Sequence, residues 1–292
     1  MPSQTLPPLN TQLPFNSALQ LETTVPEGEK PYLDSIRQWI FGHTGLHFDD
    51  KKYFTLYRRL QTVCWRMTIP SLQELDRQLH EAGSSELAVQ VVCAVSTNHT
   101  FFFRELDGLN RIERTILPEL PRGEAWRIWS AAAASGEEAY TIAILLAEAL
   151  GLDYALKMVS ILGTDISHPM IDQAEHGVYD PGRLELVPPD LLAKYFEPTG
   201  LGQRRVIAAV RKLCTFRRMN LQSMPLPFKN PFHVIVCRNV LYYFDAPEQK
   251  RLLEEMYNWT VPGGWLITSA TETISGQSTR WRKLDVGLFR KG

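Results

Sequence analysis

The spacing of hydrophobic residues divides the chain near residue 126. From residue 31 to about residue 97, apolar side chains recur every three or four positions, which predicts amphipathic helices. The helical stretches are 32–45, 49–67, 71–83 and 84–96. Ser71 and Glu74 have the spacing of a capping box at the start of the third stretch. Because no strand pattern occurs here, we predict a small all-helical domain.

The pattern after residue 126 is one of alternating strands and helices. Short, continuously apolar runs predict strands at 125–131, 157–165, 232–239 and 263–270. Helical spacing predicts helices at 138–150, 167–177 and 247–260. Strands without a polar face predict a parallel sheet that helices cover on both sides. The predicted fold class is therefore α/β and Rossmann-like.

The stretch between Leu184 and Phe216 interrupts this alternation. Residues 204–218 predict two short antiparallel strands, an inserted hairpin. At the other end of the chain, prolines interleaved with Ser, Thr, Gln and Asn predict a flexible tail. The predicted organisation is a tail over 1–30, a helical domain over 31–97, a linker over 98–125, and an α/β domain over 126–292 with a β insertion at about 185–218.

Composition and charge exclude several classes of protein. The net charge of −1 and the pI of about 6.7 disfavour a general nucleic-acid binder. The four cysteines, Cys64, Cys93, Cys214 and Cys237, show no C-x-x-C spacing. We therefore expect reduced thiols in a cytoplasmic protein and no metal site. No apolar run approaches the roughly 20 residues of a membrane span, and we expect a monomer.

Ligand-binding residues are expected directly after the strands, since open α/β sheets bind ligands at the carboxyl ends of their strands. The stretch SAAAASGEEAY (130–140) is rich in small residues but lacks the G-x-G-x-x-G fingerprint of a dinucleotide site. Glu137 and Glu138 would repel a phosphate and attract a cationic ligand. Alternatively, these carboxylates only stabilise the start of the next helix.

Polar residues also follow two later strands. Asp165 is placed to accept hydrogen bonds from a ribose, or alternatively to cap the next helix, for which Ser167 is also available. Asn239 and Tyr243 are expected at the mouth of the pocket, without the Pro-Pro of methylases that act on base amino groups. The neighbouring Tyr242 could also face the pocket, but we favour the interpretation that it is an aromatic residue of the hydrophobic core.

The most specific signals are six motifs in a fixed order from about residue 96 onward. They are STNHTFFFRE (96–105), WSAAAASGEEAYTIA (129–143), LGTDIS (162–167), MNL (219–221), VCRNVLYYFD (236–245) and VPGGWLITSATE (261–272). Together they resemble the CheR-type chemotaxis receptor methyltransferases. The resemblance implies a protein-glutamate O-methyltransferase that uses S-adenosylmethionine (SAM) to esterify glutamates of bacterial chemoreceptors. It also implies a helical N-terminal domain, a SAM-binding α/β domain and a small antiparallel β insertion.

The resemblance also implies roles for individual residues. It assigns cofactor contacts to Asn98, Thr100, Arg104, Glu137, Asp165, Asn220, Leu221, Arg238 and Asn239. It places STNHTFFFRE between the domains, where its phenylalanines would pack both domains together. Our hypothesis is that Arg104 and Tyr243 are the catalytic residues, holding the substrate carboxylate in line with the methyl group. The alternative for Arg104 is a simple ion pair with Glu105.

Cationic residues of the second helix recur at intervals of seven and form one basic stripe. They are Lys51, Lys52, Arg58, Arg59 and Arg66. The family presents such a helix to the acidic methylation region of a receptor coiled coil, although a stripe of this kind is also typical of an ordinary solvated face.

Two further expectations concern function. The β insertion looks short, so we expect an enzyme that acts without a receptor's C-terminal pentapeptide. The alternative function is a non-catalytic signalling module that binds SAM or its product S-adenosylhomocysteine (SAH). A nucleic-acid methylase lacks support in the charge and motifs, and a dehydrogenase lacks the glycine fingerprint.

Overall fold

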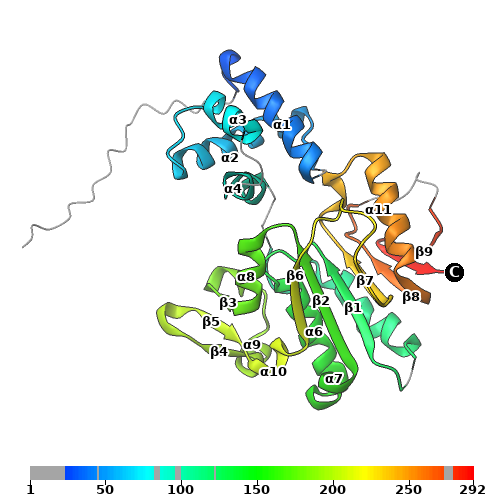
Figure 1. Ribbon diagram of the computed structural model, residues 1–292. Coiled ribbons are helices and arrows are strands. Elements are labelled where there is room, and N and C mark those ends of the chain that lie inside the picture. Colours follow the sequence, from blue (N-terminus) through cyan, green and yellow to red (C-terminus); the bar gives the residue numbers. More distant parts are fainter. Residues whose placement is uncertain (1–23, 45, 82–85, 96–99, 122, 273–278) are drawn as a thin grey trace, which may run out of the picture.

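A helical N-terminal region stands over an α/β domain in the computed structural model (Figure 1). The structure describes residues 24–44, 46–81, 86–95, 100–121, 123–272 and 279–292. Most of the predicted tail lies outside these residues, and so does Asn98 of the linker. Among the described residues, no single helix has the length and apolar character that crossing a membrane requires.

The N-terminal region contains the predicted helices. They are confirmed as α1 (Lys30–Thr44), α2 (Tyr53–Arg66), α3 (Leu72–Glu81) and α4 (Glu86–Val95). The helix α2 is amphipathic and buries Leu56, Leu60 and Val63 at intervals of four and three. The Ser71 hydroxyl accepts a hydrogen bond from the Glu74 amide at 3.2 Å, which confirms one half of the predicted capping box.

The α/β domain is built on one seven-stranded sheet. In spatial order its strands are β6 (Cys214–Arg218), β2 (Val159–Asp165), β1 (Trp126–Ala131), β7 (Phe232–Cys237), β8 (Thr260–Ile267), β10 (Leu288–Lys291) and β9 (Trp281–Asp285). The first five run parallel, and β10 pairs antiparallel with both β8 and β9. The four predicted strands are confirmed. All residues of β7 and all but one of β1 are buried, which explains why these central strands read as continuous apolar runs.

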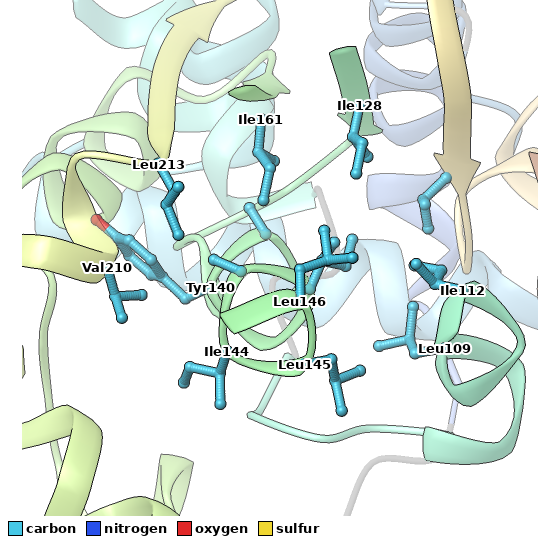
Figure 2. Packing of buried hydrophobic residues seen from close by; sticks show 14 of the residues in the cluster. Leu109, Ile112, Ile128, Tyr140, Ile144, Leu145, Leu146, Ile161, Val210 and Leu213 are labelled. Atoms are coloured by element: carbon cyan, nitrogen blue, oxygen red, sulfur yellow. The ribbon is translucent and has the colours of Figure 1, made fainter. Parts of the chain in front are cut away.

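Helices cover both faces of this sheet. The helices of the α/β domain are α5 (Leu106–Arg111), α6 (Glu137–Leu150), α7 (Leu152–Met158), α8 (His168–His176), α9 (Pro189–Tyr195), α10 (Ala208–Arg211) and α11 (Ala246–Asn258). Figure 2 shows side chains pointing outward from α6 in several directions, toward Ile128 and Ile161 of the sheet and toward Leu109 and Ile112. Because α6 is packed on nearly all sides, its sequence is apolar nearly all round.

The prediction of an inserted hairpin at residues 204–218 is wrong for its second half. The first half forms β5 (Arg204–Val206), the middle strand of a small antiparallel sheet with β3 (Val178–Tyr179) and β4 (Phe196–Pro198). The second half is β6, which pairs in parallel with β2 at the edge of the main sheet. Phe216 explains the placement, since its buried ring lies 5.3 Å from that of Tyr140 on α6.

Three contacts fasten the helical region to the α/β domain near the ends of the parallel strands. The side-chain amide of Asn220 donates to the carbonyl oxygen of His43 at 2.9 Å. The amide of His47 donates to the carbonyl oxygen of Tyr243. Cys93 on α4 and Ser167 before α8 lie 3.1 Å apart through Sγ and Oγ. The region after α1 therefore forms a roof over the edge where ligands are expected.

Candidate functional site

Two connected hollows lie where β1, β2 and β7 end. The first is mainly apolar and is lined by Thr44, Leu46, Ala132, Ala134, Thr164, Asp165, Ile166, Met219, Asn220, Leu221, Asn239, Val240, Tyr243 and Phe244. The second is polar and is lined by Thr100, Phe101, Arg104, Leu109, Ala132, Ala133, Ala134, Glu138, Thr141, Arg238 and Asn239. Because both contain Ala132, Ala134 and Asn239, they form one continuous site.

Asp165 is the acidic residue of the apolar hollow. Its carboxylate accepts backbone hydrogen bonds from Ala134 and Ser167, each at 2.9 Å. Burial raises the pKa of Asp165, and the two backbone donors oppose that shift. Each carboxylate oxygen retains a lone pair, so a ribose hydroxyl can donate to it. Asp165 thus both shapes the loop after β1 and offers an acceptor to the hollow.

The polar hollow contains charges of both signs. The Glu138 carboxylate accepts from the Ser130 hydroxyl at 2.7 Å and lies 3.2 Å from Nη1 of Arg238. Burial raises the pKa of Glu138, and the charge of Arg238 opposes that shift. Arg104 lies in the linker segment that precedes α5. Its Nε is 3.7 Å from the Glu105 carboxylate, which is too far for a hydrogen bond. A zwitterionic ligand group would therefore find both an anion and cations here.

Glu137 occupies a different position from Glu138. Its side chain is fully buried, accepts both of its hydrogen bonds from the Ser135 hydroxyl, and lies 3.3 Å from Arg183. It does not belong to the lining of either hollow. Of the two carboxylates at the start of α6, the structure turns Glu138 toward the site, and a ligand contact of Glu137 stays a prediction.

Several residues around the hollows have backbone conformations that residues other than glycine rarely adopt. The residues Phe103, Glu105, Ala132, Ala134 and Asn239 all have positive φ values, between 47° and 63°. Such conformations cost on the order of 1–3 kcal/mol each and persist only where surrounding contacts hold them. Their concentration here supports a functional role for this edge of the sheet.

Arg238 and Glu105 hold the linker against the end of β7. The Arg238 guanidinium is almost fully buried and donates to the Arg104 carbonyl oxygen at 2.8 Å. The Glu105 carboxylate accepts from Asn239 at 3.0 Å and from the Ser269 hydroxyl at 2.9 Å. Partial burial raises the pKa of Glu105, but these hydrogen bonds and the Arg238 charge together lower it below its usual value. Both side chains fix Arg104 in place.

Glu272 is a residue that our sequence interpretation left without a role. Its buried carboxylate accepts four backbone hydrogen bonds, from Asn239 at 3.0 Å, Val240 at 2.7 Å, Leu241 at 2.8 Å and Ser269 at 3.0 Å. It therefore holds the whole turn that leads to Tyr243. The motif that ends in Glu272 was part of the resemblance, but nothing local in the sequence indicates these partners.

The aromatic turn after β7 is arranged differently from our expectation. Tyr243 is buried and lines the apolar hollow. Tyr242 is 41% exposed, so the prediction that it is a core residue is wrong. The Lys52 ammonium lies 5.1 Å from the ring centroid of Tyr242 and 5.2 Å from that of Tyr243. This cation–π contact brings the start of α2 to the mouth of the site.

The phenylalanine block anchors the linker to one domain. Phe102 is fully buried and contacts Tyr179 and Phe196 edge to face, with ring centroids 4.8 and 5.0 Å apart. Phe103 belongs to the same hydrophobic cluster of the α/β domain. The expectation that Phe102 and Phe103 pack both domains together is therefore wrong, because their partners belong to α6 and the β insertion.

The predicted basic stripe is divided in the structure. Lys51, Arg58 and Arg66 are exposed. Arg59 is half-buried and donates to the Val95 carbonyl oxygen at the end of α4, at 2.6 Å. With Lys52 held over the tyrosines, the exposed cationic face of α2 is narrower than the sequence spacing predicts.

The chemistry of the two hollows fits one kind of ligand. An apolar hollow with a single acid suits an adenosine, and a neighbouring hollow with both signs of charge suits an amino-acid group. None of the described residues forms a cluster of three or more metal-ligating His, Cys, Asp or Glu side chains. The doubly wound sheet and this site define a SAM-dependent methyltransferase.

Comparison with known proteins identifies the family. The family model "CheR methyltransferase, SAM binding domain" matches residues 98–287. The chain belongs to the CheR methyltransferase family, and its cofactor is SAM.

Curated relatives extend the match beyond that domain. The "Chemotaxis protein methyltransferase" of Borreliella burgdorferi is 29% identical over 85% of this chain and 89% of its own. That of Vibrio parahaemolyticus is 31% identical over 89% of this chain and 94% of its own. The "Chemotaxis protein methyltransferase 2" of Pseudomonas aeruginosa is 36% identical over 82% of this chain and 85% of its own. The similarity therefore includes most of the helical region.

Proposed function

We propose that the protein transfers the methyl group of SAM to glutamate side chains of bacterial chemoreceptors, forming methyl esters. The observation that supports this proposal best is the arrangement of the two hollows under a roof from the helical region. Asn239 lines both the polar hollow and the apolar hollow. Tyr243 lines the apolar hollow and lies under the Lys52 ammonium at the start of α2. The names of the relatives support a role in chemotaxis.

The two parts of SAM are assigned to the two hollows. Asp165, Asn220 and Leu221 would bind the adenosine part, since they line the apolar hollow. The amino-acid part would lie in the polar hollow, where Glu138 faces an ammonium group and Thr100 and Arg104 face a carboxylate. Arg238 and Asn239 complete this wall, and Asn98 precedes it in the linker.

In the proposed reaction, the main contribution of the protein is to position the two reactants. SAM supplies an electrophilic methyl group on a sulfonium. A glutamate side chain, with an ordinary pKa of about 4.3, is already ionised at neutral pH, so no general base is required. Holding both reactants in line can supply on the order of 7–11 kcal/mol. In our proposal Arg104 and Tyr243 hold the substrate carboxylate.

The experiment that tests this function is transfer of labelled methyl groups. The full chain is incubated with labelled SAM and a panel of chemoreceptor cytoplasmic fragments, and the product is treated with alkali. Label on a receptor fragment that alkali releases as methanol is the expected result, since methyl esters hydrolyse readily. Alkali-stable label contradicts the carboxyl acceptor. Binding of SAM without transfer to any fragment favours the non-catalytic signalling module.

The substrate interaction is proposed to be independent of a receptor tail. The loop between β4 and β5 is only the five residues 199–203, closed by a hydrogen bond from the Thr199 amide to the Gln203 carbonyl oxygen at 2.9 Å. A fragment truncated by its last five residues is expected to be methylated as fast as the intact one. A large loss of rate on truncation contradicts independence from the receptor tail and leaves the proposed methyl transfer unaffected.

We further infer that the enzyme acts in the cytoplasm and as a monomer. The acceptor glutamates lie in the cytoplasmic part of a receptor, and the site is assembled from one chain. Light scattering of the purified protein is expected to give the mass of one 33.4 kDa chain.

A further inference from the structure

A further charged hollow lies at the free edge of the main sheet, apart from the SAM site. It is formed by residues of α6, α8, α10 and the edge strand β6 (Figure 1), and its volume is about 380 Å³. The charged side chains of its lining are Arg211, Lys212, Arg217 and Glu175. None of its lining residues belongs to either hollow of the SAM site. We call it the edge hollow.

The edge hollow is positively charged. Three of its four charged side chains are cations, so two positive charges remain unmatched in a protein whose net charge is −1. The acid of the lining, Glu175, lies 3.7 Å from Nη1 of Arg217. The surrounding sequence has the same character, since no Asp or Glu occurs between Glu197 and Asp245. Cations that gather in a hollow without matching acids attract an anion.

Arg211 is held in place but is not fully satisfied. Its Nε is buried, and none of the described residues provides a hydrogen-bond partner for it. Its stem packs closely on the backbone, because a Cβ built on Gly177 would lie 3.0 Å from Cδ of Arg211. An unsatisfied buried donor costs on the order of 1–3 kcal/mol. An anion bound by this guanidinium would offset that cost.

The edge strand adds a backbone donor to the hollow. The Leu213 carbonyl oxygen and the Met219 amide bond to β2, and backbone groups along a strand point alternately to its two sides. Phe216, between them, therefore points its backbone to the outer side, where its carbonyl oxygen accepts from Nη1 of Arg217 at 2.6 Å. The Phe216 amide lies on the same outer side, next to the exposed Thr215.

We propose that the edge hollow binds the phosphate group of a small phosphorylated ligand. Its donors are the guanidinium groups of Arg211 and Arg217, the Lys212 ammonium and the Phe216 amide. Guanidinium groups suit phosphate because two parallel N–H donors match two phosphate oxygens. The volume lies near the lower end of the roughly 300–1,000 Å³ of small-molecule sites. The proposal does not depend on the methyl acceptor of the enzyme.

Protection of the sheet edge explains only part of this charge. Edge strands often carry cations that prevent pairing with another sheet. At the opposite edge, β9 has the exposed Arg282 and Lys283 in this position, and Arg217 on β6 fits the same role. Arg211 and Lys212 lie outside β6. A buried Nε repels no strand, so edge protection leaves Arg211 unexplained.

The first test is calorimetric titration of the full chain with inorganic phosphate, inorganic triphosphate and ATP. Saturating SAH is present, so that the adenosine hollow is occupied. We expect triphosphate to bind with a Kd of about 1 mM or below. Arg211→Gln should weaken binding about ten-fold or more, because it removes a charge-assisted pair, and Arg211→Lys should recover part of the loss. Arg282→Gln is the matched control and should bind triphosphate as wild type does.

The three probes identify the source of the phosphate. ATP binding much tighter than triphosphate assigns the site to a nucleotide, whereas equal affinities assign it to the phosphate group alone, and both results uphold the proposal. Absence of binding by every probe at about 10 mM overturns it. Equal weakening by Arg211→Gln and Arg282→Gln also overturns it, since binding then reflects the overall charge of the protein.

A second measurement needs no substitution and so does not depend on the folding of a variant. Lys212 and Lys283 are both exposed and react with an acylating reagent, and mass spectrometry follows each separately. Triphosphate at about ten times its Kd should slow acylation of Lys212 about ten-fold, because only about one site in eleven stays empty. Lys283 should react at an unchanged rate. Equal protection of both lysines, or protection of neither, contradicts a site in the edge hollow.

Discussion

Single charged residues at this site serve mainly to hold loops in uncommon conformations. Arg238 binds the carbonyl oxygen of Arg104, and Glu272 binds the backbone of Asn239. Asn239 has a φ of 58°, and its neighbours in the linker are similarly constrained. The residues that contact a ligand are therefore placed by residues behind them, which is the general requirement for a preorganised site.

Arg104→Ala should lower kcat for receptor methylation by about 100-fold or more, if Arg104 holds the acceptor carboxylate. Arg104→Lys should recover part of this loss, because it retains a charge without the planar fork. Steady-state methylation of a receptor fragment measures both. SAH affinity, measured by calorimetry, separates the two proposed contacts of Arg104: a loss of kcat at unchanged SAH affinity supports the substrate role. Unchanged kcat in Arg104→Ala contradicts it.

Glu272→Gln should weaken the turn that carries Asn239 and Tyr243. The amide retains one acceptor oxygen but points an N–H group toward backbone N–H groups that the carboxylate now satisfies. We expect the free energy of unfolding to fall by about 1–3 kcal/mol. SAH affinity, measured well below the unfolding temperature, should fall as well.

Glu113→Gln is the control for Glu272, since Glu113 is exposed and lies outside both hollows. It should change neither unfolding nor SAH binding. A Glu272→Gln variant that is less stable but binds SAH normally would show that Glu272 supports only the fold.

Among the elements, α2 connects the helical region to the chemistry. Its buried face packs inside the helical region, and its outer face is cationic. Lys52, the residue directly before its first turn, lies over the rings of Tyr242 and Tyr243. Cations of α2 that look equivalent in the sequence therefore have different tasks. Arg58 is exposed, whereas Arg59 binds the last turn of α4 through Val95.

Charge reversal should separate these tasks. Lys51→Glu combined with Arg58→Glu should raise KM for an acidic receptor fragment about ten-fold and leave thermal unfolding and SAH affinity unchanged. Arg59→Glu should instead destabilise the helical region by about 1–3 kcal/mol, because it removes a charged donor from a helix C-terminus. Thermal unfolding and methylation kinetics measure the difference. Equal effects of both variants on stability contradict the division.

At the scale of the whole molecule, the site exists only where the helical region meets the sheet. Thr44 and Leu46 line the same hollow as Asp165, although about 120 residues separate them in the chain. A ligand in this hollow contacts both parts. Its binding energy should therefore stabilise both parts together.

SAH at a concentration 100 times its Kd should raise the free energy of unfolding by about 2.7 kcal/mol. Because the hollow spans both parts, the helical region and the α/β domain should shift together. Chemical denaturation followed by far-UV circular dichroism and by tryptophan fluorescence measures this. If SAH shifts the unfolding transition of one part and leaves a separate transition of the other part unchanged, the two parts do not share the site.

His233 should make stability depend on pH. Burial, together with the charge of Arg127, lowers the pKa of His233, whose Nδ1 accepts a hydrogen bond from the Arg127 amide at 3.1 Å. The unfolded chain takes up this proton near pH 6.5 and the folded chain only at lower pH. Stability contributed by the neutral ring is therefore lost as pH falls below about 6.5, by at most about 1.4 kcal/mol per pH unit.

His233→Gln should make the free energy of unfolding depend less on pH between pH 7 and 5. The slope should decrease by on the order of 1 kcal/mol per pH unit. His176→Gln, at an exposed histidine of α8, is the control and should leave the slope unchanged. Urea denaturation at several pH values measures the slopes. Equal slopes in wild type and His233→Gln contradict the assignment.

The sequence by itself determined the features that neighbouring residues specify. Helical spacing predicted α1 to α4, and continuous apolar runs predicted β1, β2, β7 and β8, because periodicity reports which faces are buried. The position of polar residues after strands indicated where the ligand edge would form, since parallel strands bring their carboxyl ends together. Motif order indicated the family before any contact was known.

Only the tertiary structure decided which distant partner each side chain meets. Cys214–Arg218 joined the main sheet because Phe216 packs against α6, and a short alternating segment does not specify its neighbour. Tyr242 is exposed and Tyr243 buried because the turn after β7 is held by Glu272, which follows about 30 residues later. Local pattern specifies an element and its buried face, whereas the identity of the covering partner depends on the packing of the whole chain.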